Sequence, residues 1–180
     1  MMFLDIECTS LDSDVGMTVA IGLILPNGET KIFFAENPNE ERKIIEESIE
    51  LIKKFKEEPI VIWYAGFDIP FLVTRAIKHG LDISEIYDFK IIDLCKLVQK
   101  NLKFRSNKLD EVSKFFGIKK NLSITGKDVH KLYLKAIKGN EEAREKIIEH
   151  CKDDLLAMKK IFEKLESYIK KWLEKNTNYK

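Results

Sequence analysis

The stretch FLDIECTSL, residues 3–11, decides the fold of this protein and carries its first candidate functional residues. It begins with β-favouring apolar residues and its side chains alternate, which predicts a strand over residues 2–8. Side chains two apart on a strand lie on the same face, about 7 Å from each other, so Asp5 and Glu7 share one face. Neighbouring carboxylates repel each other unless a cation lies between them. The pair therefore indicates a site for a hard divalent ion such as Mg²⁺.

The residues that follow predict an antiparallel meander. The apolar run 17–25 and the run KIFFA at 31–35 surround the turn sequence PNGE. Two β-rich runs around a Pro-Asn-Gly turn are typical of a β-hairpin. We therefore expect the first three strands to be antiparallel neighbours.

The rest of the chain predicts helices around two further strands. The apolar run IVIWY at 60–64 is typical of a buried parallel strand, and FKIID at 89–93 predicts the last strand. Helical spacing predicts helices at 39–58, from 68 or 69 to 80, and at roughly 94–101, 108–116, 127–138 and 141–173. No repeat or linker interrupts this order. We expect an α/β fold, with a mixed sheet flanked by helices and a helical C-terminal half, in a single domain over residues 1–180.

The second candidate acid, Asp68, follows the apolar strand. Pro70 lies just after it, and proline is well placed in the first turn of a helix. An aspartate at this position is a good helix N-cap. However, the carboxyl end of a strand is also where ligands bind in open α/β sheets, so both roles stay open.

The long final helix supplies the third candidate acid. Apolar residues recur in steps of three and four along 148–172 and define its buried stripe. At about 100° per residue, Asp154 lies about 60° from Cys151 on that stripe, whereas Asp153 lies about 160° away. We therefore expect Asp154 and His150, on the same side, to border the core and Asp153 to face water. A carboxylate at the margin of a core needs a partner or a metal ion.

Other polar residues are expected to be structural. Asp93 ends the last predicted strand, where it is placed to cap the next helix. Asp12 and Asp14 are expected in a turn. His79 and His130 show no partner spacing, so we expect both on the surface.

Composition limits the partners and the location of the protein. The chain carries 31 basic and 30 acidic side chains, so a nucleic-acid-binding protein would have to separate its charges locally. No apolar run approaches the roughly 20 residues that span a bilayer, and MMFLDIEC is too short and too acidic for a secretory signal. Cys8, Cys95 and Cys151 lack metal-ligand spacing and predict reduced thiols. We expect a cytoplasmic protein without membrane contacts.

Taken in order, three segments resemble the DEDD superfamily of 3′–5′ exonucleases. FLDIECTSL is similar to the first motif, WYAGFDIPFL at 63–72 to the second, and HCKDDLLAM at 150–158 to the third. The stretch 93–118 is similar to the region between the second and third motifs. The resemblance runs from Phe3 to about Leu165 and is greatest to stand-alone exonucleases related to the proofreading domains of replicative DNA polymerases. It implies an RNase H-like fold.

The resemblance also implies a mechanism. Asp5, Glu7, Asp68 and Asp154 would hold two divalent cations, Mg²⁺ or Mn²⁺. One cation would activate a water for attack on the terminal phosphodiester, and the other would stabilise the leaving 3′ oxygen. The products would be nucleoside 5′-monophosphates. The implied partner is the 3′ end of DNA or RNA, with a single-stranded terminus as the simplest substrate.

Two features depart from the family pattern. In the third motif, the family usually has either a Tyr separated from the Asp by three residues or a His separated from it by four. Here three residues separate His150 from Asp154, so a histidine stands at the spacing of the tyrosine. A histidine can position a water or accept its proton, so we expect His150 to be catalytic. In the second motif, residues 63–66 replace an expected asparagine. Trp63 or Tyr64 either stacks on a terminal base or packs in the core.

Three other functions remain open. RNase H-like domains include endonucleases and junction resolvases with similar carboxylate clusters. A non-catalytic nucleic-acid-binding relative and a metal-binding regulatory protein are the other two. His150 beside Asp154 favours an exonuclease, and the complete set of four acids argues against a binding module, because binding a polyanion favours the loss of such charges.

Overall fold

The computed structural model describes residues 1–121 and 124–177, so the last three residues of the expected domain lie outside the described part. Its strands are β1 (Met2–Cys8), β2 (Thr18–Ile24), β3 (Thr30–Phe34), β4 (Ile60–Ile62) and β5 (Ile91–Asp93). Its α-helices are α1 (Glu41–Lys53), α2 (Ala65–Lys78), α3 (Leu94–Asn101), α4 (Leu109–Phe115), α5 (Gly126–Ala136) and α6 (Glu141–Thr177). Short 3-10 helices, η1 and η2, span Pro38–Glu40 and Ser84–Asp88. In the described part of the chain, no helix combines the length and apolar character needed to cross a membrane.

The five strands form one mixed sheet in the order β3-β2-β1-β4-β5. The pairs β1/β2 and β2/β3 are antiparallel, which confirms the predicted meander. The pairs β1/β4 and β4/β5 are parallel. Strand β1, which carries the first two candidate acids, therefore lies at the centre of the sheet.

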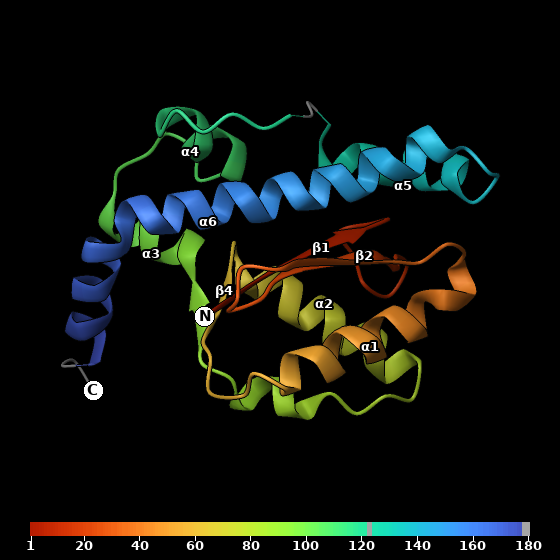
Figure 1. Cartoon of the computed structure of the whole chain (residues 1–180), viewed down its shortest axis with the longest axis horizontal. Coiled ribbons are helices and arrows are strands. Elements are labelled where there is room, and N and C mark those ends of the chain that lie inside the picture. The colour runs from red at the N-terminus through yellow and green to blue at the C-terminus, as the bar shows by residue number, and fades with distance from the viewer. Residues whose placement is uncertain (122–123, 178–180) are drawn as a thin grey trace.

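Helices cover both faces of the sheet (Figure 1). Leu4 and Ile6 of β1 belong to a core cluster with α1 and α2. Phe3 points to the other face, where its ring lies 5.8 Å from that of Phe162 in α6, in a second cluster with α3 and α4. Full burial of one such apolar side chain stabilises the folded state by about 1.5–3 kcal/mol. The expected fold, a sheet flanked by helices with a helical C-terminal half, is confirmed.

Helix α2 begins earlier than the sequence predicts. Tyr64 adopts a left-handed backbone conformation with φ of 69°, and its carbonyl accepts a hydrogen bond from the Phe67 N–H at 2.9 Å. The chain therefore turns into the helix at Ala65. As a result Asp68 lies inside the first turns of α2 and is not its N-cap, so the capping role considered for Asp68 is wrong.

The predicted structural roles of other polar residues were mostly correct. Asp93 caps α3 by accepting the Lys96 N–H at 2.9 Å. Asp12 and Asp14 are exposed in the loop between β1 and β2, and His130 is exposed on α5. His79 differs from its expected surface role, because it takes part in a polar network.

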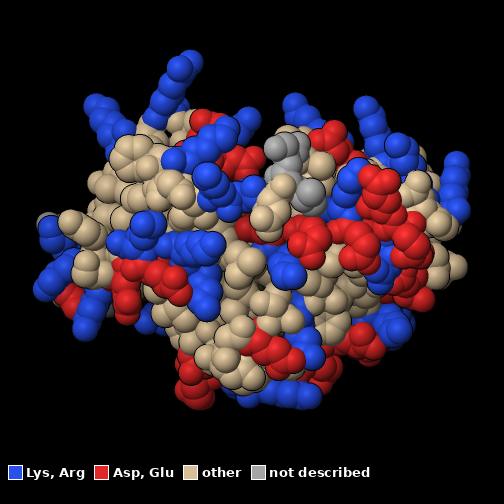
Figure 2. Space-filling model, turned by 45° about the horizontal axis from the view of Figure 1, so that its top comes forward, with Lys and Arg blue, Asp and Glu red and all other residues tan. Residues whose placement is uncertain are grey.

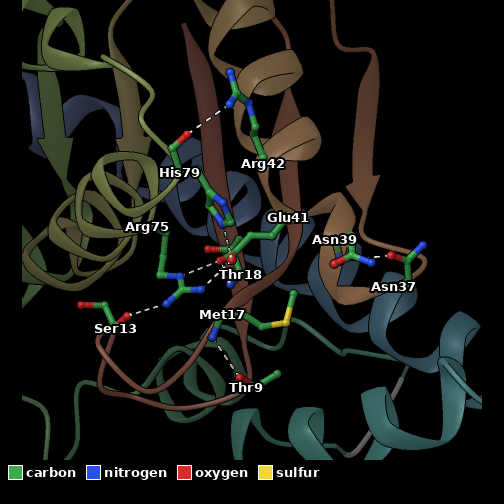
Figure 3. Close-up of polar contacts among 10 residues, drawn as sticks. All are labelled: Thr9, Ser13, Met17, Thr18, Asn37, Asn39, Glu41, Arg42, Arg75 and His79. Carbon is green, nitrogen blue, oxygen red and sulfur yellow. Dashed lines mark hydrogen bonds and ion pairs between the residues drawn. The ribbon is translucent and has the colours of Figure 1, made fainter.

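This network centres on Glu41 and connects α1, α2 and the loop that follows β1 (Figure 3). Glu41 accepts hydrogen bonds from Arg75 Nε at 2.8 Å and Nη2 at 2.6 Å, and from the Thr18 N–H at 2.7 Å. His79 Nε2 lies 2.8 Å from Glu41 Oε2. Arg75 also donates to the carbonyl of Ser13 at 3.0 Å. The network therefore fixes the loop that leaves the acidic end of β1.

Candidate active site

Strand β1 presents two candidate acids at the centre of the sheet. Asp5 lies opposite Gly22 of β2, and a shift in register follows between Glu7 and Cys8. Such a bulge re-aims the side chains around it. Since β4 pairs with β1 only as far as Leu4, both acids extend past the end of the parallel pair.

Helix α6 lies close to this part of the sheet because Gly22 has no side chain. A β-carbon on Gly22 would lie 2.5 Å from Sγ of Cys151 and 2.6 Å from Cδ1 of Leu155. Both distances are well below an ordinary contact between heavy atoms of about 3.5–4.0 Å. Glycine at this position therefore allows α6 to lie close to β2, next to the acids of β1.

His150 lies between two of the acids. Its Nε2 is 3.7 Å from Glu7 Oε1, and its Nδ1 is 3.7 Å from Asp154 Oδ1. The residue is only 4% exposed, and burial lowers the pKa of His150 although Asp154 opposes this shift. A neutral imidazole at neutral pH can accept a proton. The side of α6 predicted for His150 and Asp154 from the helical wheel agrees with this geometry.

Asp68 reaches the same cluster from α2. It is buried, and burial raises the pKa of Asp68 to about 8, although backbone N–H groups of Asp68 and Ile6 favour its charged form. Repulsion from the Asp68 carboxylate is one of the causes that raise the pKa values of Asp5 and Glu7. The structure thus brings together all five residues singled out from the sequence.

The pKa values of these acids show how unfavourable their charges are without a counter-ion. Burial is the main reason that the pKa values of Asp5 and Glu7 are raised well above their usual range, and repulsion from the neighbouring carboxylates adds to it. Burial also raises the pKa of Asp154, which His150 and Lys120 oppose. A divalent cation would reverse this balance, because its charge favours the ionised carboxylates.

The available donor atoms fit such a cation. Asp5, Glu7 and Cys151 each offer one ligand atom within 4.8 Å of the others, and Oδ2 of Asp5 is buried without a hydrogen-bond partner among the described residues. Burial raises the pKa of the Cys151 thiol, so the thiol stays protonated and hydrogen-bonds to Asp5. The carboxylate oxygens are the ligands that Mg²⁺ and Mn²⁺ prefer.

Lys120 is a member of the site that the sequence did not indicate. Its ammonium group forms ion pairs with Asp154 and, at 2.7 Å, with Asp110. Burial lowers the pKa of Lys120, but the two acids outweigh burial and raise it overall. A lysine in the connection between α4 and α5 carries no periodicity that would mark it, so only the fold reveals its place.

The expectation that Asp153 faces water is wrong. Asp153 is 5% exposed and accepts hydrogen bonds from the N–H of Asn121 at 2.7 Å and from its Nδ2 at 2.9 Å. A helical wheel relates a residue to the apolar stripe of its own helix but not to the elements that cover the opposite face. Here the connection after α4 covers that face, so Asp153 fixes the segment next to Lys120.

The two aromatic residues of the second motif, Trp63 and Tyr64, have different environments. Trp63 packs against the α6-side core cluster and donates from Nε1 to the Asn107 carbonyl at 3.2 Å. Tyr64 is exposed at the start of α2. The packing role considered for the pair therefore applies to Trp63, and Tyr64 is left open to solvent.

A cavity of about 300 Å³ borders Glu7. Leu11, Phe67 and Lys127 line it together with the loop that follows β1. This volume is at the lower end of small-ligand pockets, about 300–1,000 Å³. Apolar side chains and a lysine therefore lie directly beside the acids.

Comparisons with known proteins agree with this fold. The family model described as RNase H superfamily matches residues 2–166. The structure also superposes on part of the family B DNA polymerase from the hyperthermophilic archaeon Pyrobaculum calidifontis, with a TM-score of 0.77 and 21% sequence identity. The match covers 91% of this chain and 24% of the polymerase chain, and at this identity it shows the fold alone. The search of curated proteins found no significant match.

Proposed function

Because the chain belongs to the RNase H superfamily, we propose that it is a metal-dependent 3′–5′ exonuclease that releases nucleoside 5′-monophosphates. The observation that carries the proposal is the meeting of four carboxylates from β1, α2 and α6 beside one buried histidine. The resemblance of the three motifs to the DEDD exonucleases supports the direction of hydrolysis. The structural likeness to part of a DNA polymerase supports a nucleic-acid substrate.

The four acids have one task in this proposal. Asp5, Glu7, Asp68 and Asp154 would hold two divalent cations, Mg²⁺ or Mn²⁺. When bound, the cations supply the charge that activates the attacking water and stabilises the departing 3′ oxygen. The raised pKa values of the acids mean that proton loss from these residues would accompany cation binding.

His150 would orient the attacking water and accept its proton. Its ring lies between Glu7 and Asp154 at 3.7 Å from an oxygen of each, so it borders the space where the water must lie. Its lowered pKa keeps it unprotonated at neutral pH, as a general base requires. This residue would take the role of the tyrosine that usually stands at this spacing.

Lys120 and the neighbouring cavity would hold the substrate. The ammonium group of Lys120 lies against Asp154, where it would attract the oxygens of the scissile phosphate. Leu11 and Phe67 line the cavity beside Glu7 and would contact the terminal nucleoside. Lys127 in the same wall would contact a phosphate.

The test is a product analysis with matched variants. Purified protein with Mn²⁺ is incubated with 5′-labelled single-stranded DNA and RNA, and the products are separated at single-nucleotide resolution. We expect a ladder that shortens from the 3′ end, loss of this ladder in Asp154→Asn, and full activity in Asp12→Asn, which changes an exposed loop acid near the site.

The other outcomes identify the alternatives. Discrete internal cuts would show an endonuclease of the same fold. Intact strands together with retained binding would show a non-catalytic nucleic-acid-binding relative. Equal activity of Asp154→Asn and wild type would contradict the assignment of the acidic site.

A further inference from the structure

Positive charge is concentrated in one segment of this nearly neutral chain. Residues 94–120, which form α3, α4 and their connections, contain eight basic and two acidic residues. We call the exposed part of this segment the α3–α4 surface. Figure 2 shows lysine and arginine side chains gathered on the upper left of the molecule, the side on which Figure 1 places α4. The local separation of charge expected for a nucleic-acid-binding protein is therefore present.

Most of this charge is available to a partner. Seven of the eight basic residues are exposed. Among the described residues, four of them have no acidic partner: Lys103, Arg105, Lys108 and Lys119. Long basic side chains without internal ion pairs can contact an anionic backbone without first breaking a contact.

An aromatic group lies within the same surface. The rings of Phe104, Phe115 and Phe116 form an edge-to-face cluster with centroid distances of 5.0, 5.2 and 6.2 Å. Phe115 is 70% exposed, although burial of a phenylalanine is normally favourable. An exposed ring that is held in place by two neighbouring rings is a rigid platform for stacking. A groove of about 640 Å³ lies beside it, between the end of α4 and α6. Its charged lining consists of three lysines and one acid, Lys119, Lys160, Lys164 and Glu163.

One end of the segment meets the acidic site, and the other lies against the start of α2. At its start, Nζ of Lys96 lies 3.7 Å from the Asp93 carboxylate and would lie 3.7 Å from a β-carbon on Gly66 in α2. At its end, Lys120 pairs with Asp154. The α3–α4 surface is therefore continuous with the acidic site at Lys120.

We infer that the α3–α4 surface binds the single-stranded nucleic acid that leads into the acidic site, with its phosphates on the lysines and a base on Phe115. This inference rests on the proposed exonuclease function and adds the path of the strand. A positively charged groove with an aromatic platform is the combination that binds single strands without sequence preference. An acidic protein would use the charge, but it would not require a base-stacking ring.

The test separates strand binding from chemistry. Binding of a fluorescein-labelled oligothymidylate and oligouridylate of about 16 nucleotides is measured by anisotropy in EDTA, for the full chain and its variants. Hydrolysis of thymidine 5′-monophosphate p-nitrophenyl ester with Mn²⁺ is measured in parallel, because this small ester occupies only the acidic site.

We expect Phe115→Ala to weaken oligonucleotide binding about 5- to 100-fold, as for loss of one stacked base. The double variant Lys103→Glu/Arg105→Glu should weaken binding at least tenfold and reduce the salt dependence by about 0.7 for each lost phosphate contact. Hydrolysis of the ester should stay within twofold of wild type in both. The matched controls are Tyr87→Ala, also an exposed ring, and Lys54→Glu/Lys56→Glu, which makes the same charge change at the end of α1.

Each other outcome has one meaning. The inference is overturned if the control charge variant weakens binding as much as Lys103→Glu/Arg105→Glu does. It is also overturned if Phe115→Ala and Lys103→Glu/Arg105→Glu both bind as wild type does. In either case, hydrolysis of the ester would still support the exonuclease. Weakening by the surface variants in a protein that does not hydrolyse the ester supports the surface and contradicts the exonuclease. Absence of oligonucleotide binding by the wild type overturns the inference.

Discussion

Substitution of Gly22 by alanine tests the packing on which the whole site depends. Gly22 lies in β2 opposite Asp5, and α6 packs directly over it. The added β-carbon would lie 2.5 Å from Cys151 Sγ and 2.6 Å from Leu155 Cδ1. Contacts between heavy atoms normally begin at about 3.5 Å, so the middle of α6 must move away from the sheet by about 1 Å.

The magnitude follows from this displacement. Overpacking of a core by one methyl group costs about 1–3 kcal/mol, which for a chain of this length lowers Tm by about 2–12 °C. The same movement carries His150 and Asp154 away from Glu7. A misplacement of about 1 Å reduces catalytic rates by about 100-fold, so the exonuclease rate should fall by about this factor even at a temperature where the variant is fully folded.

The assay compares Tm by calorimetry and exonuclease rate with Mn²⁺ at a temperature where both proteins are folded. Gly126→Ala is the matched control for Tm, because Gly126 begins α5 and, among the described residues, only its chain neighbours and its own helix lie within 4 Å of an added β-carbon. It should leave Tm unchanged or slightly raised, since alanine is the better helix former. The double variant Gly22→Ala/Cys151→Ala should recover part of the lost Tm. A Gly22→Ala protein with wild-type Tm and rate would show that α6 does not lie this close to β2.

The remaining predictions concern single residues and pH. His150→Ala should lower the exonuclease rate about 100-fold or more if the imidazole positions the water, and a near-normal rate would assign it to packing alone. Asp153→Ala should reduce Tm and rate together, because it releases both hydrogen bonds to Asn121; activity equal to wild type would refute this anchoring role. Glu41→Gln should destabilise the protein by about 3–5 kcal/mol in denaturant titrations, since it breaks a buried ion pair, and a loss below about 1 kcal/mol would contradict that value. The pKa of Asp68 is about 8 in the folded protein and about 3.9 when unfolded, so metal-free protein should lose stability as pH rises between these values. Mg²⁺ should therefore raise Tm more at pH 8 than at pH 5, and an equal rise at both would contradict the raised pKa.

Local patterns were enough to predict most elements of the fold. The alternating start of β1 and the Pro-Asn-Gly turn predicted the antiparallel meander, and apolar periodicity predicted the helices. The ends of elements were less certain, because they depend on single backbone conformations. The early start of α2 at Ala65 follows from the left-handed conformation of Tyr64, which no propensity indicates for a tyrosine.

The candidate acids were also visible in the sequence, because carboxylates at the margins of apolar elements are unusual. Asp5 and Glu7 shared a strand face, and the helical wheel selected Asp154 and placed His150 on its side. The structure brings these residues together with Asp68, while their catalytic roles stay predictions.

What the sequence by itself determined is therefore the set of elements and the acids that each one carries. Only the tertiary structure decided what lies between and around them. Nothing in the sequence distinguishes Gly22 from other strand glycines, and only the packing of α6 over it shows its role. The connection between α4 and α5 lies against α6, so that its Lys120 pairs with Asp154 and its Asn121 donates to Asp153. The physical reason is that periodicity describes one element against its own core, whereas charges and close contacts depend on which elements meet across space.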